Sequence, residues 1–153
     1  MTGAGSCIQI AVIGPSSATD GEIRAAEEIG GILAEHGAIL ISGGLGGVME
    51  ASCRGAKKKG GITVGILPHT GSGNPHLTVQ VRTGLSHARN IVVVESADSV
   101  VAVGGAHGTL SEIAIALKTG KPVFGYRSWD IGGVEPCTTP ADAALRALDA
   151  ARR

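Results

Sequence analysis

Short apolar runs alternate with longer amphipathic stretches along the chain. The runs are rich in β-branched residues, which is typical of strands buried on both faces of a parallel sheet. The stretches between them carry apolar residues at helical spacing. The predicted strands are 8–13, 38–42, 62–67, 99–103 and 122–126, and the predicted helices are 20–36, 48–59, 86–95, 109–118 and 140–150. This alternation predicts one α/β domain over 1–153, with a mostly parallel sheet and helices on both faces.

Capping signals mark the first and last helices. Thr19 and Glu22 have the spacing of a capping box. Thr139 is expected to cap the last helix, with Pro140 at its first position. Residues 1–6 are small and polar, and we expect them to be loosely held.

The helix 109–118 has an unusual pattern. Thr109 is expected to cap it, and its inner face is expected to carry four residues at helical spacing. These are Leu110, Ile113, Ala114 and Leu117. Ile115 and Ala116 lie outside that face, so the helix is apolar nearly all round. Such a helix is normally buried on more than one side, which predicts a homo-oligomer, a dimer or a tetramer.

Two segments lack a periodic pattern. Residues 68–81 combine prolines, glycines and hydroxyl residues, so they are predicted to form a long functional loop. Within it, Thr70, Ser72 and Asn74 are candidates to bind a phosphate or the polar atoms of a ring, although loop hydroxyls are more often simply solvated. Residues 127–137 are predicted to be irregular.

Charge and cysteine content narrow the choice of function. The formal net charge is zero and no basic stripe stands out, which argues against a surface dedicated to nucleic acid or membrane. Cys7, Cys53 and Cys137 are odd in number and lack metal-ligand spacing. This pattern favours a reducing, cytoplasmic setting. No apolar run reaches membrane-spanning length.

Three glycine-rich turns each follow a predicted strand and precede a predicted helix. They are 14–17, 43–47 and 104–109. The carboxyl ends of parallel strands share one sheet edge, and the start of a helix offers free N–H groups to an anion. The turns therefore predict a site for a small phosphate-bearing ligand; alternatively, the glycines only permit tight turns. The candidate binding residues in these turns are Gly14, Ser16, Ser17, Gly43, Gly44, Gly46, Gly47, Gly105, Ala106, His107, Gly108 and Thr109.

The sequence lacks the common motifs for binding nucleotides and metal ions. The dinucleotide fingerprint lacks its last glycine, because Met49 occupies that position. The phosphate-binding loop of nucleoside triphosphatases is also missing, since Gly120-Lys121 is followed by Pro122. Four histidines, namely His69, His76, His87 and His107, lack the paired spacing of metal ligands, so no metal site is predicted.

Two motifs in register carry a family resemblance. Gly43-Gly44-Leu45-Gly46-Gly47-Val48-Met49 and Gly104-Gly105-Ala106-His107-Gly108-Thr109-Leu110-Ser111-Glu112 both follow strands. The first resembles the first glycine motif, and the second the Pro-Gly-Gly-x-Gly-Thr-x-x-Glu motif, of a Rossmann-like family. That family joins Lonely Guy (LOG) proteins, molybdenum-cofactor carrier proteins and the DNA-processing proteins of natural transformation. The resemblance covers nearly the whole chain and implies a single Rossmann-like domain.

The resemblance implies two functions. LOG enzymes hydrolyse the N-glycosidic bond of cytokinin riboside 5′-monophosphates, and their catalytic Arg and Glu correspond to Arg89 and Glu112. However, Ser86 and Asn90 stand where LOG proteins have Met and Lys. The Arg89-Asn90 pair looks more like the carrier branch, and both residues are candidate ligand-binding residues. The first hypothesis is therefore a carrier of a phosphate-bearing ligand such as molybdenum cofactor, and the alternative is a LOG-like phosphoribohydrolase. A scaffold with unused motifs is the third.

Arg89 and Glu112 have suitable chemistry for either function. The planar, charged guanidinium of Arg89 can bind a phosphate through two parallel hydrogen bonds. The Glu112 carboxylate can polarise a ribose hydroxyl or a water molecule. Alternatively, both are structural, with Arg89 in an ion pair with Glu95 or Glu112.

Overall fold

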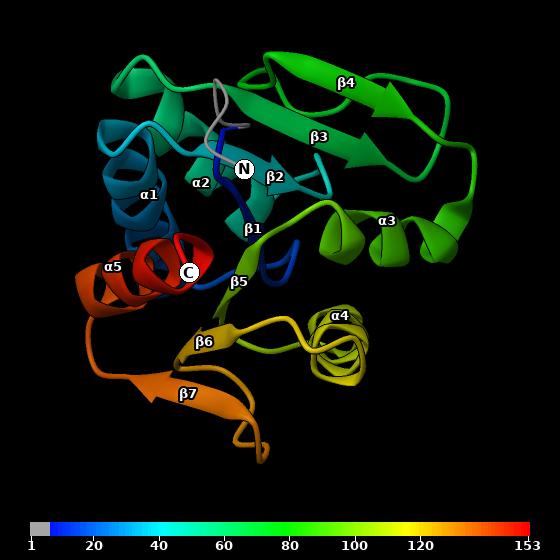
Figure 1. Ribbon diagram of the computed structural model, residues 1–153. Coiled ribbons are helices and arrows are strands. Elements are labelled where there is room, and N and C mark those ends of the chain that lie inside the picture. Colours follow the sequence, from blue (N-terminus) through cyan, green and yellow to red (C-terminus); the bar gives the residue numbers. More distant parts are fainter. Residues whose placement is uncertain (1–6) are drawn as a thin grey trace.

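Seven parallel strands form one sheet in the computed structural model, which describes residues 7–153 (Figure 1). The expectation for residues 1–6 lies outside the described part. The spatial order of the strands is β4-β3-β2-β1-β5-β6-β7. Their bounds are β1 Gln9–Ile13, β2 Ile39–Ser42, β3 Thr63–Leu67, β4 Val79–Arg82, β5 Ser99–Val103, β6 Val123–Tyr126 and β7 Val134–Cys137. The predicted Rossmann-like α/β fold with a parallel sheet is confirmed.

Helices cover both faces of the sheet. They are α1 Asp20–Glu35, α2 Val48–Lys58, α3 Arg89–Glu95, α4 His107–Lys118 and α5 Pro140–Ala151, and a 3₁₀ turn, Ser86–Ala88, leads into α3. Figure 1 shows α1 and α5 on one side of β1 and β5, and α3 and α4 on the other. In the part of the chain that the structure describes, no helix is long and apolar enough to cross a membrane.

Alternate side chains of the central strands pack into two hydrophobic cores, one on each face of the sheet. On β1, Ile10 and Val12 pack into the core under α1, α2 and α5. Ala11 and Ile13 face the opposite way, into the core under α3 and α4. This alternation follows from the two-residue repeat of a strand, and it explains why the strand sequences are apolar throughout.

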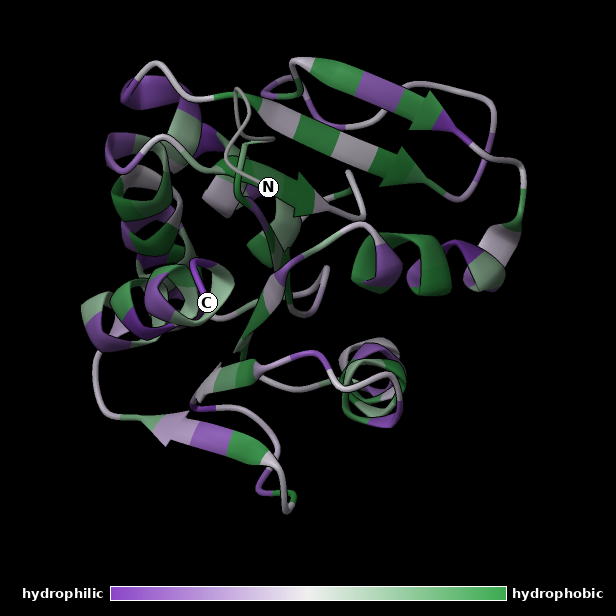
Figure 2. Ribbon diagram, viewed as in Figure 1, coloured by the Kyte–Doolittle hydropathy of each residue, from purple (hydrophilic) through white to green (hydrophobic). Residues whose placement is uncertain are grey.

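Both edge strands lie in segments where the sequence predicts no strand. β4 overlaps the expected loop 68–81 and β7 lies inside the expected irregular segment 127–137, so those expectations are wrong over these residues. Figure 2 shows that β4 alternates between apolar and polar residues as a strand does. The strand is hard to recognise from sequence because it has only four residues, most of them exposed. β7 contains Pro136, which lacks an N–H donor and is tolerated in a strand only at an edge or a bulge.

The start of α4 differs from the prediction. The helix begins at His107, and its N-cap is Ala106 in an extended conformation with no side-chain cap. Thr109 therefore does not cap the helix but lies in its first turn. By contrast, the predicted caps of α1 and α5 are confirmed. The Thr19 and Thr139 hydroxyls accept hydrogen bonds from the Glu22 and Asp142 amides at 3.2 and 3.0 Å.

The inner face of α4 is shifted by one residue from the expected one. Its buried residues are Thr109, Glu112, Ile113 and Ala116. Ala114, expected inside, is exposed, whereas Ala116, expected outside, is fully buried. Apolar periodicity alone gave the wrong register because the buried face of α4 holds two polar residues near its start. Those two polar residues lie at the sheet edge where the glycine turns meet.

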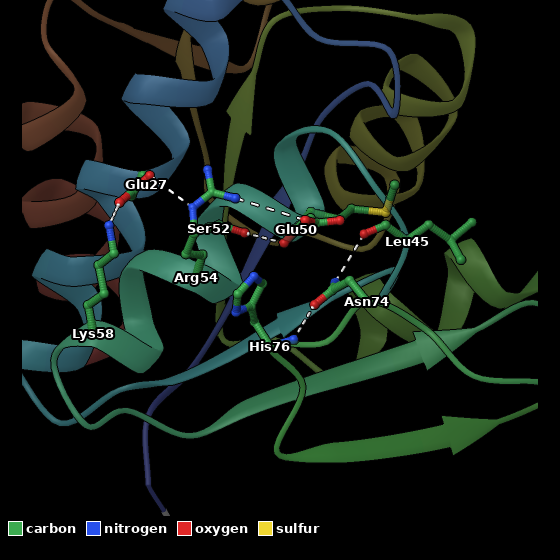
Figure 3. A network of polar contacts seen from close by, with 9 residues as sticks. Glu27, Leu45, Glu50, Ser52, Arg54, Lys58, Asn74 and His76 are labelled. Carbon is green, nitrogen blue, oxygen red and sulfur yellow. Dashed lines mark hydrogen bonds and ion pairs between the residues drawn. The ribbon is translucent and has the colours of Figure 1, made fainter.

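α1 and α2 pack unusually closely, and α2 follows directly after the second glycine turn. A Cβ atom on Gly30 would lie 1.9 Å from the Ser52 carbonyl oxygen, so only glycine fits there. Ion pairs from Glu27 to Arg54 at 3.1 Å and to Lys58 bridge the same two helices (Figure 3).

We expect Gly30→Ala to lower the free energy of unfolding by about 3 kcal/mol, because the added methyl group must push the two helix backbones apart. Gly31→Ala is the matched control. A Cβ atom there would have its nearest neighbour, Lys59 Cγ, at 3.6 Å. Because alanine favours helix more than glycine, the control is expected to be neutral or stabilising by up to about 1 kcal/mol. Urea unfolding measures both, and equal midpoints for the two variants would contradict this packing.

Candidate functional site

The strand order reverses beside β1, and a cavity lies at that point. β1 to β4 extend in one direction, whereas β5 returns to the other side of β1. In open parallel sheets this reversal leaves a crevice at the carboxyl ends of the two strands, where ligands bind. The cavity here has a volume of about 230 Å³ and is bounded by the turns that follow both strands. Its lining residues are Gly14, Pro15, Ser16, Leu45, Met49, His87, Arg89, Asn90, Ala106, Gly108, Thr109 and Glu112.

All three predicted turns contribute to the cavity or to its support, but not every predicted residue lines it. The predicted residues in the lining are Gly14, Ser16, Arg89, Asn90, Ala106, Gly108, Thr109 and Glu112. Those outside the lining are Ser17, Gly43, Gly44, Gly46, Gly47, Gly105 and His107. Sequence reasoning missed Pro15, Leu45, Met49 and His87. Pro15, Leu45 and Met49 lie in or beside the predicted glycine turns, so their position in the motifs was the available signal.

Arg89 is the principal cation of the cavity, and it is buried. It begins α3, and only 9% of it is exposed. Its Nη2 group donates to the Gly43 carbonyl at 3.4 Å, and its Nη1 group donates to Asn90 Oδ1. Among residues 7–153, its Nε group has no hydrogen-bond partner. Burial lowers the pKa of the guanidinium, and the nearby Glu112 carboxylate opposes that effect.

Gly43 has a specific role beside Arg89. A Cβ atom on Gly43 would lie 2.7 Å from Arg89 Nη2, so the absent side chain leaves room for the guanidinium. Asn90 is held in turn, because its amide donates to Ser111 Oγ at 3.2 Å and that hydroxyl donates to the Gly108 carbonyl at 2.7 Å. The second glycine turn, α3 and α4 are thus joined around the arginine. The glycines of this turn support Arg89 and do not line the cavity, whereas Leu45 of the same turn does.

The start of α4 supplies the second group of polar atoms. Thr109 is 2% exposed, and its hydroxyl has no hydrogen-bond partner within the described residues. The first N–H groups of any helix lack partners within the helix, and at α4 no side chain caps them. These N–H groups also carry the positive end of the helix dipole. The helix start therefore offers donors and positive potential to an anion.

Glu112 places a carboxyl group in the same cavity. It is 7% exposed, and burial raises its pKa from the usual 4.5 to about 7, although the Arg89 charge acts in the opposite direction. Among the described residues, none of the ion pairs within 4.0 Å includes Arg89 or Glu112. The structural alternative for Arg89, a direct ion pair with Glu95 or Glu112, is therefore not formed. Near neutral pH, Glu112 can hold or release a proton.

Asn74 in the β3–β4 loop is a structural residue. Its side-chain amide donates to the Leu45 carbonyl at 3.0 Å, and its Oδ1 accepts from the His76 backbone N–H at 3.0 Å (Figure 3). Its backbone N–H donates to the Gly44 carbonyl at 2.9 Å. Asn74 thus ties the loop to the second glycine turn. Thr70 and Ser72, the other candidates of this loop, are exposed and outside the cavity.

A larger groove between α3 and α4 adjoins the cavity. It has a volume of about 540 Å³ and shares His87, Asn90 and Gly108 with the cavity lining. His107 lies in this groove together with the apolar side chains Ile91 and Ile115. Over residues 7–153, no cluster of three or more His, Cys, Asp or Glu side chains could hold a metal ion. The cavity and groove together form one continuous surface at the carboxyl edge of the sheet.

Most of the amino-acid sequence matches the model of a described protein family. The model of the SLOG cluster4 family matches residues 7–146. The chain belongs to the SLOG cluster4 family. This agrees with the resemblance seen in the two glycine motifs. An uncharacterised protein of Archaeoglobus fulgidus is 46% identical over 138 residues, which span 89% of this chain and 91% of that protein.

Solved structures of similar proteins include molybdenum cofactor binding proteins. The molybdenum cofactor binding protein of Rippkaea orientalis superposes with a TM-score of 0.90 at 33% identity, covering 97% of this chain and 99% of that one. The molybdenum cofactor carrier protein of Chlamydomonas reinhardtii gives a TM-score of 0.87 at 32% identity, with coverage of 95% and 99%. The match over nearly the full length of both proteins places this SLOG cluster4 chain with the carrier-type branch.

The stability of the protein should depend on the ionisation of Glu112. The folded state holds this proton up to about pH 7, whereas the unfolded chain releases it near pH 4.5. The contribution of Glu112 to the free energy of unfolding is therefore fully present below pH 4.5 and is lost as the pH rises to 7 and above. Glu112→Gln cannot ionise, so its free energy of unfolding, relative to wild type, should rise by roughly 3 kcal/mol between pH 4.5 and pH 8. Urea unfolding at several pH values measures this difference, and a constant difference would contradict it.

Proposed function

We propose that this chain binds and carries a small phosphate-bearing molecule, with molybdenum cofactor as its cargo. The observation that carries the proposal is the pair of unpartnered polar atoms at the cavity, Arg89 Nε and Thr109 Oγ1. A buried donor without a partner costs about 1–3 kcal/mol, and more if it is charged. Such groups are rare in native proteins, and a bound ligand is one way in which they are satisfied. The similar proteins that bind molybdenum cofactor support this choice of cargo.

The phosphate end of the ligand would lie at the start of α4. The uncapped N–H groups and the Thr109 hydroxyl would donate to its oxygen atoms, and the Arg89 guanidinium would balance its charge. Burial of Arg89 and Thr109 strengthens these contacts, because little water screens them. The cavity is too small for a complete cofactor, so the rest of the ligand would extend into the groove between α3 and α4.

A second function, hydrolysis of a nucleoside 5′-monophosphate at its N-glycosidic bond, is favoured by one observation. Glu112 lies in the same cavity with a pKa of about 7, which suits a general acid or base at neutral pH. In this alternative Arg89 binds the phosphate and Glu112 polarises a ribose hydroxyl or water. The two functions share the anion site and differ only in whether Glu112 drives turnover.

The amino-acid composition supports the proposed location and partner of the protein. Cys7, Cys53 and Cys137 are free thiols, which fits the reducing cytoplasm as the place of action. The balanced net charge gives no support to a nucleic-acid or membrane partner. We therefore propose a cytoplasmic carrier whose partner is the small molecule itself.

Mass spectrometry of material that co-purifies with the protein tests the cargo directly. Protein purified from cells that make molybdenum cofactor should release a phosphorylated pterin on denaturation. The Arg89→Ala variant, prepared identically, should release little. Wild-type protein that carries no pterin, yet binds another phosphate-bearing compound, would support the anion site. It would contradict molybdenum cofactor as the cargo.

We expect Arg89→Ala to weaken binding of a phosphate-bearing probe by about 10- to 100-fold, because a charge-assisted hydrogen bond is lost. The loss should be larger at low salt, where screening is weaker. Arg24→Ala is the matched control, since Arg24 is exposed on α1 and outside the cavity lining. Isothermal titration with AMP measures the affinity of wild type and of both variants. Equal affinities for the two variants would contradict a role for Arg89 in binding.

Glu112→Gln separates the two functions when it is tested at pH 6 and at pH 8, because wild-type Glu112 is mostly protonated at the first pH and mostly ionised at the second. In a carrier, wild type releases no base from nucleoside monophosphates, and the substitution weakens binding only modestly. In a hydrolase, base release by wild type is lost by roughly 10²- to 10⁴-fold in the variant while binding is nearly intact. Chromatographic detection of the free base, alongside titration, measures both quantities. If binding and base release are both unchanged in the Arg89 and Glu112 variants, the two residues have a structural role.

The protein is also expected to form a homo-oligomer, a dimer or larger. With the corrected register of α4, its outer surface carries exposed Ala114 and partly exposed Leu110 and Leu117. A second copy covering this apolar surface would remove it from water. Light scattering at micromolar concentration tests the expectation, and a monomeric mass would contradict it.

A further inference from the structure

We propose that Trp129 is a positioning residue of the anion site: its indole N–H fixes the turn that presents the first amide groups of α4. This assignment rests on the proposed function. Trp129 lies in the segment between β6 and β7, and β6 is the neighbour of β5 in the sheet. It is therefore brought against the β5–α4 turn from outside the cavity. Trp129 is not among the cavity-lining residues.

Two contacts define the position of the indole. Its Nε1–H donates to the carbonyl of Ala106, the N-cap of α4, at 3.2 Å. Its ring lies directly against Gly105, where a Cβ atom would be 2.9 Å from Nε1 and 3.1 Å from Cδ1. The glycine at position 105 thus makes room for the indole, which accounts for a predicted ligand-binding glycine that does not line the cavity.

The opposite side of the turn is also held. Gly104 has a φ of 67°, and a Cβ atom there would lie 1.6 Å from Glu22 Oε2, so the carboxylate of Glu22 occupies that space. Glu22 is itself fixed, because its Oε1 accepts from the Thr19 N–H at 2.9 Å in the capping box of α1. The turn 104–106 is therefore enclosed between the start of α1 and the indole of Trp129.

The orientation of the Ala106 peptide group controls the helix start. The Ala106 carbonyl accepts from the Leu110 N–H at 2.9 Å, which is the first hydrogen bond of α4, as well as from the indole. The starts of α1 and α5 are fixed by threonine caps, whereas α4 lacks a side-chain cap. The indole supplies this missing restraint without occupying the N–H groups, so the anion site stays open. A small displacement of fixed donors is enough to weaken the binding of a ligand they contact.

Trp129→Phe provides the test, with inorganic phosphate as the probe. Phenylalanine keeps an aromatic ring beside Gly105 and removes the donor, together with the part of the indole that exceeds a phenyl ring. We expect phosphate binding to weaken by about three- to tenfold, the usual effect of one lost hydrogen bond, with little change in melting temperature. The matched control is Tyr126→Phe, which alters a neighbouring aromatic residue that the structure does not join to Ala106. Titration at a temperature where all three proteins are folded measures the affinities.

A second measurement on wild-type protein covers the case in which Trp129→Phe does not fold. Trp129 is the only tryptophan in the chain, so its indole N–H gives a single assigned NMR signal. Phosphate should shift this signal with the same dissociation constant as the backbone amides of Gly108 and Thr109. A saturated site with an unmoved indole signal, or a Trp129→Phe variant with wild-type affinity, would overturn the assignment alone. Wild-type protein that binds neither phosphate nor AMP would overturn the proposed function, and the assignment with it.

Discussion

Burying the guanidinium of Arg89 imposes the constraint on which the rest of the site depends. A buried charge needs hydrogen bonds on each of its donors, and the described part of the chain supplies them only for Nη1 and Nη2. Gly43 leaves space for the group, and Asn90 links it to α4 through Ser111. Glu112 lies close enough to influence the charge without forming a direct ion pair. The arginine is thus oriented at the cavity, and its Nε group has no partner among the described residues.

The sheet topology explains why these groups meet. Arg89 begins the helix before β5, and Thr109 and Glu112 lie on the helix after it. Because β5 pairs with β1 at the point where strand order reverses, the turns after both strands open onto the same crevice. The tight contact at Gly30 holds α2, and Asn74 holds the turn before it. The fold therefore supports the site from elements that do not themselves touch the cavity.

The sequence predicted the central strands and the converging turns because their signals are local: β-branched runs, glycine clusters and caps. It did not predict the edge strands, because each has only four residues, and a run this short with two polar residues or a proline gives a weak strand signal. The register of α4 was predicted wrongly for a more informative reason. Hydrophobic periodicity assigns polar residues to the outside, whereas Thr109 and Glu112 are buried and line the cavity. The support that Trp129 gives to the turn has no sequence pattern at all, since it depends on the pairing of β5 with β6.

The central claim is that the unpartnered groups of Arg89 and Thr109 form an anion site with the start of α4. A crystal structure of the protein grown at a saturating phosphate concentration tests this most directly. The account predicts tetrahedral density in the cavity, within hydrogen-bond distance of Arg89 Nε and Thr109 Oγ1 and of the first N–H groups of α4. Density for water alone in the cavity, with Arg89 and Glu112 joined in a direct ion pair, would contradict it.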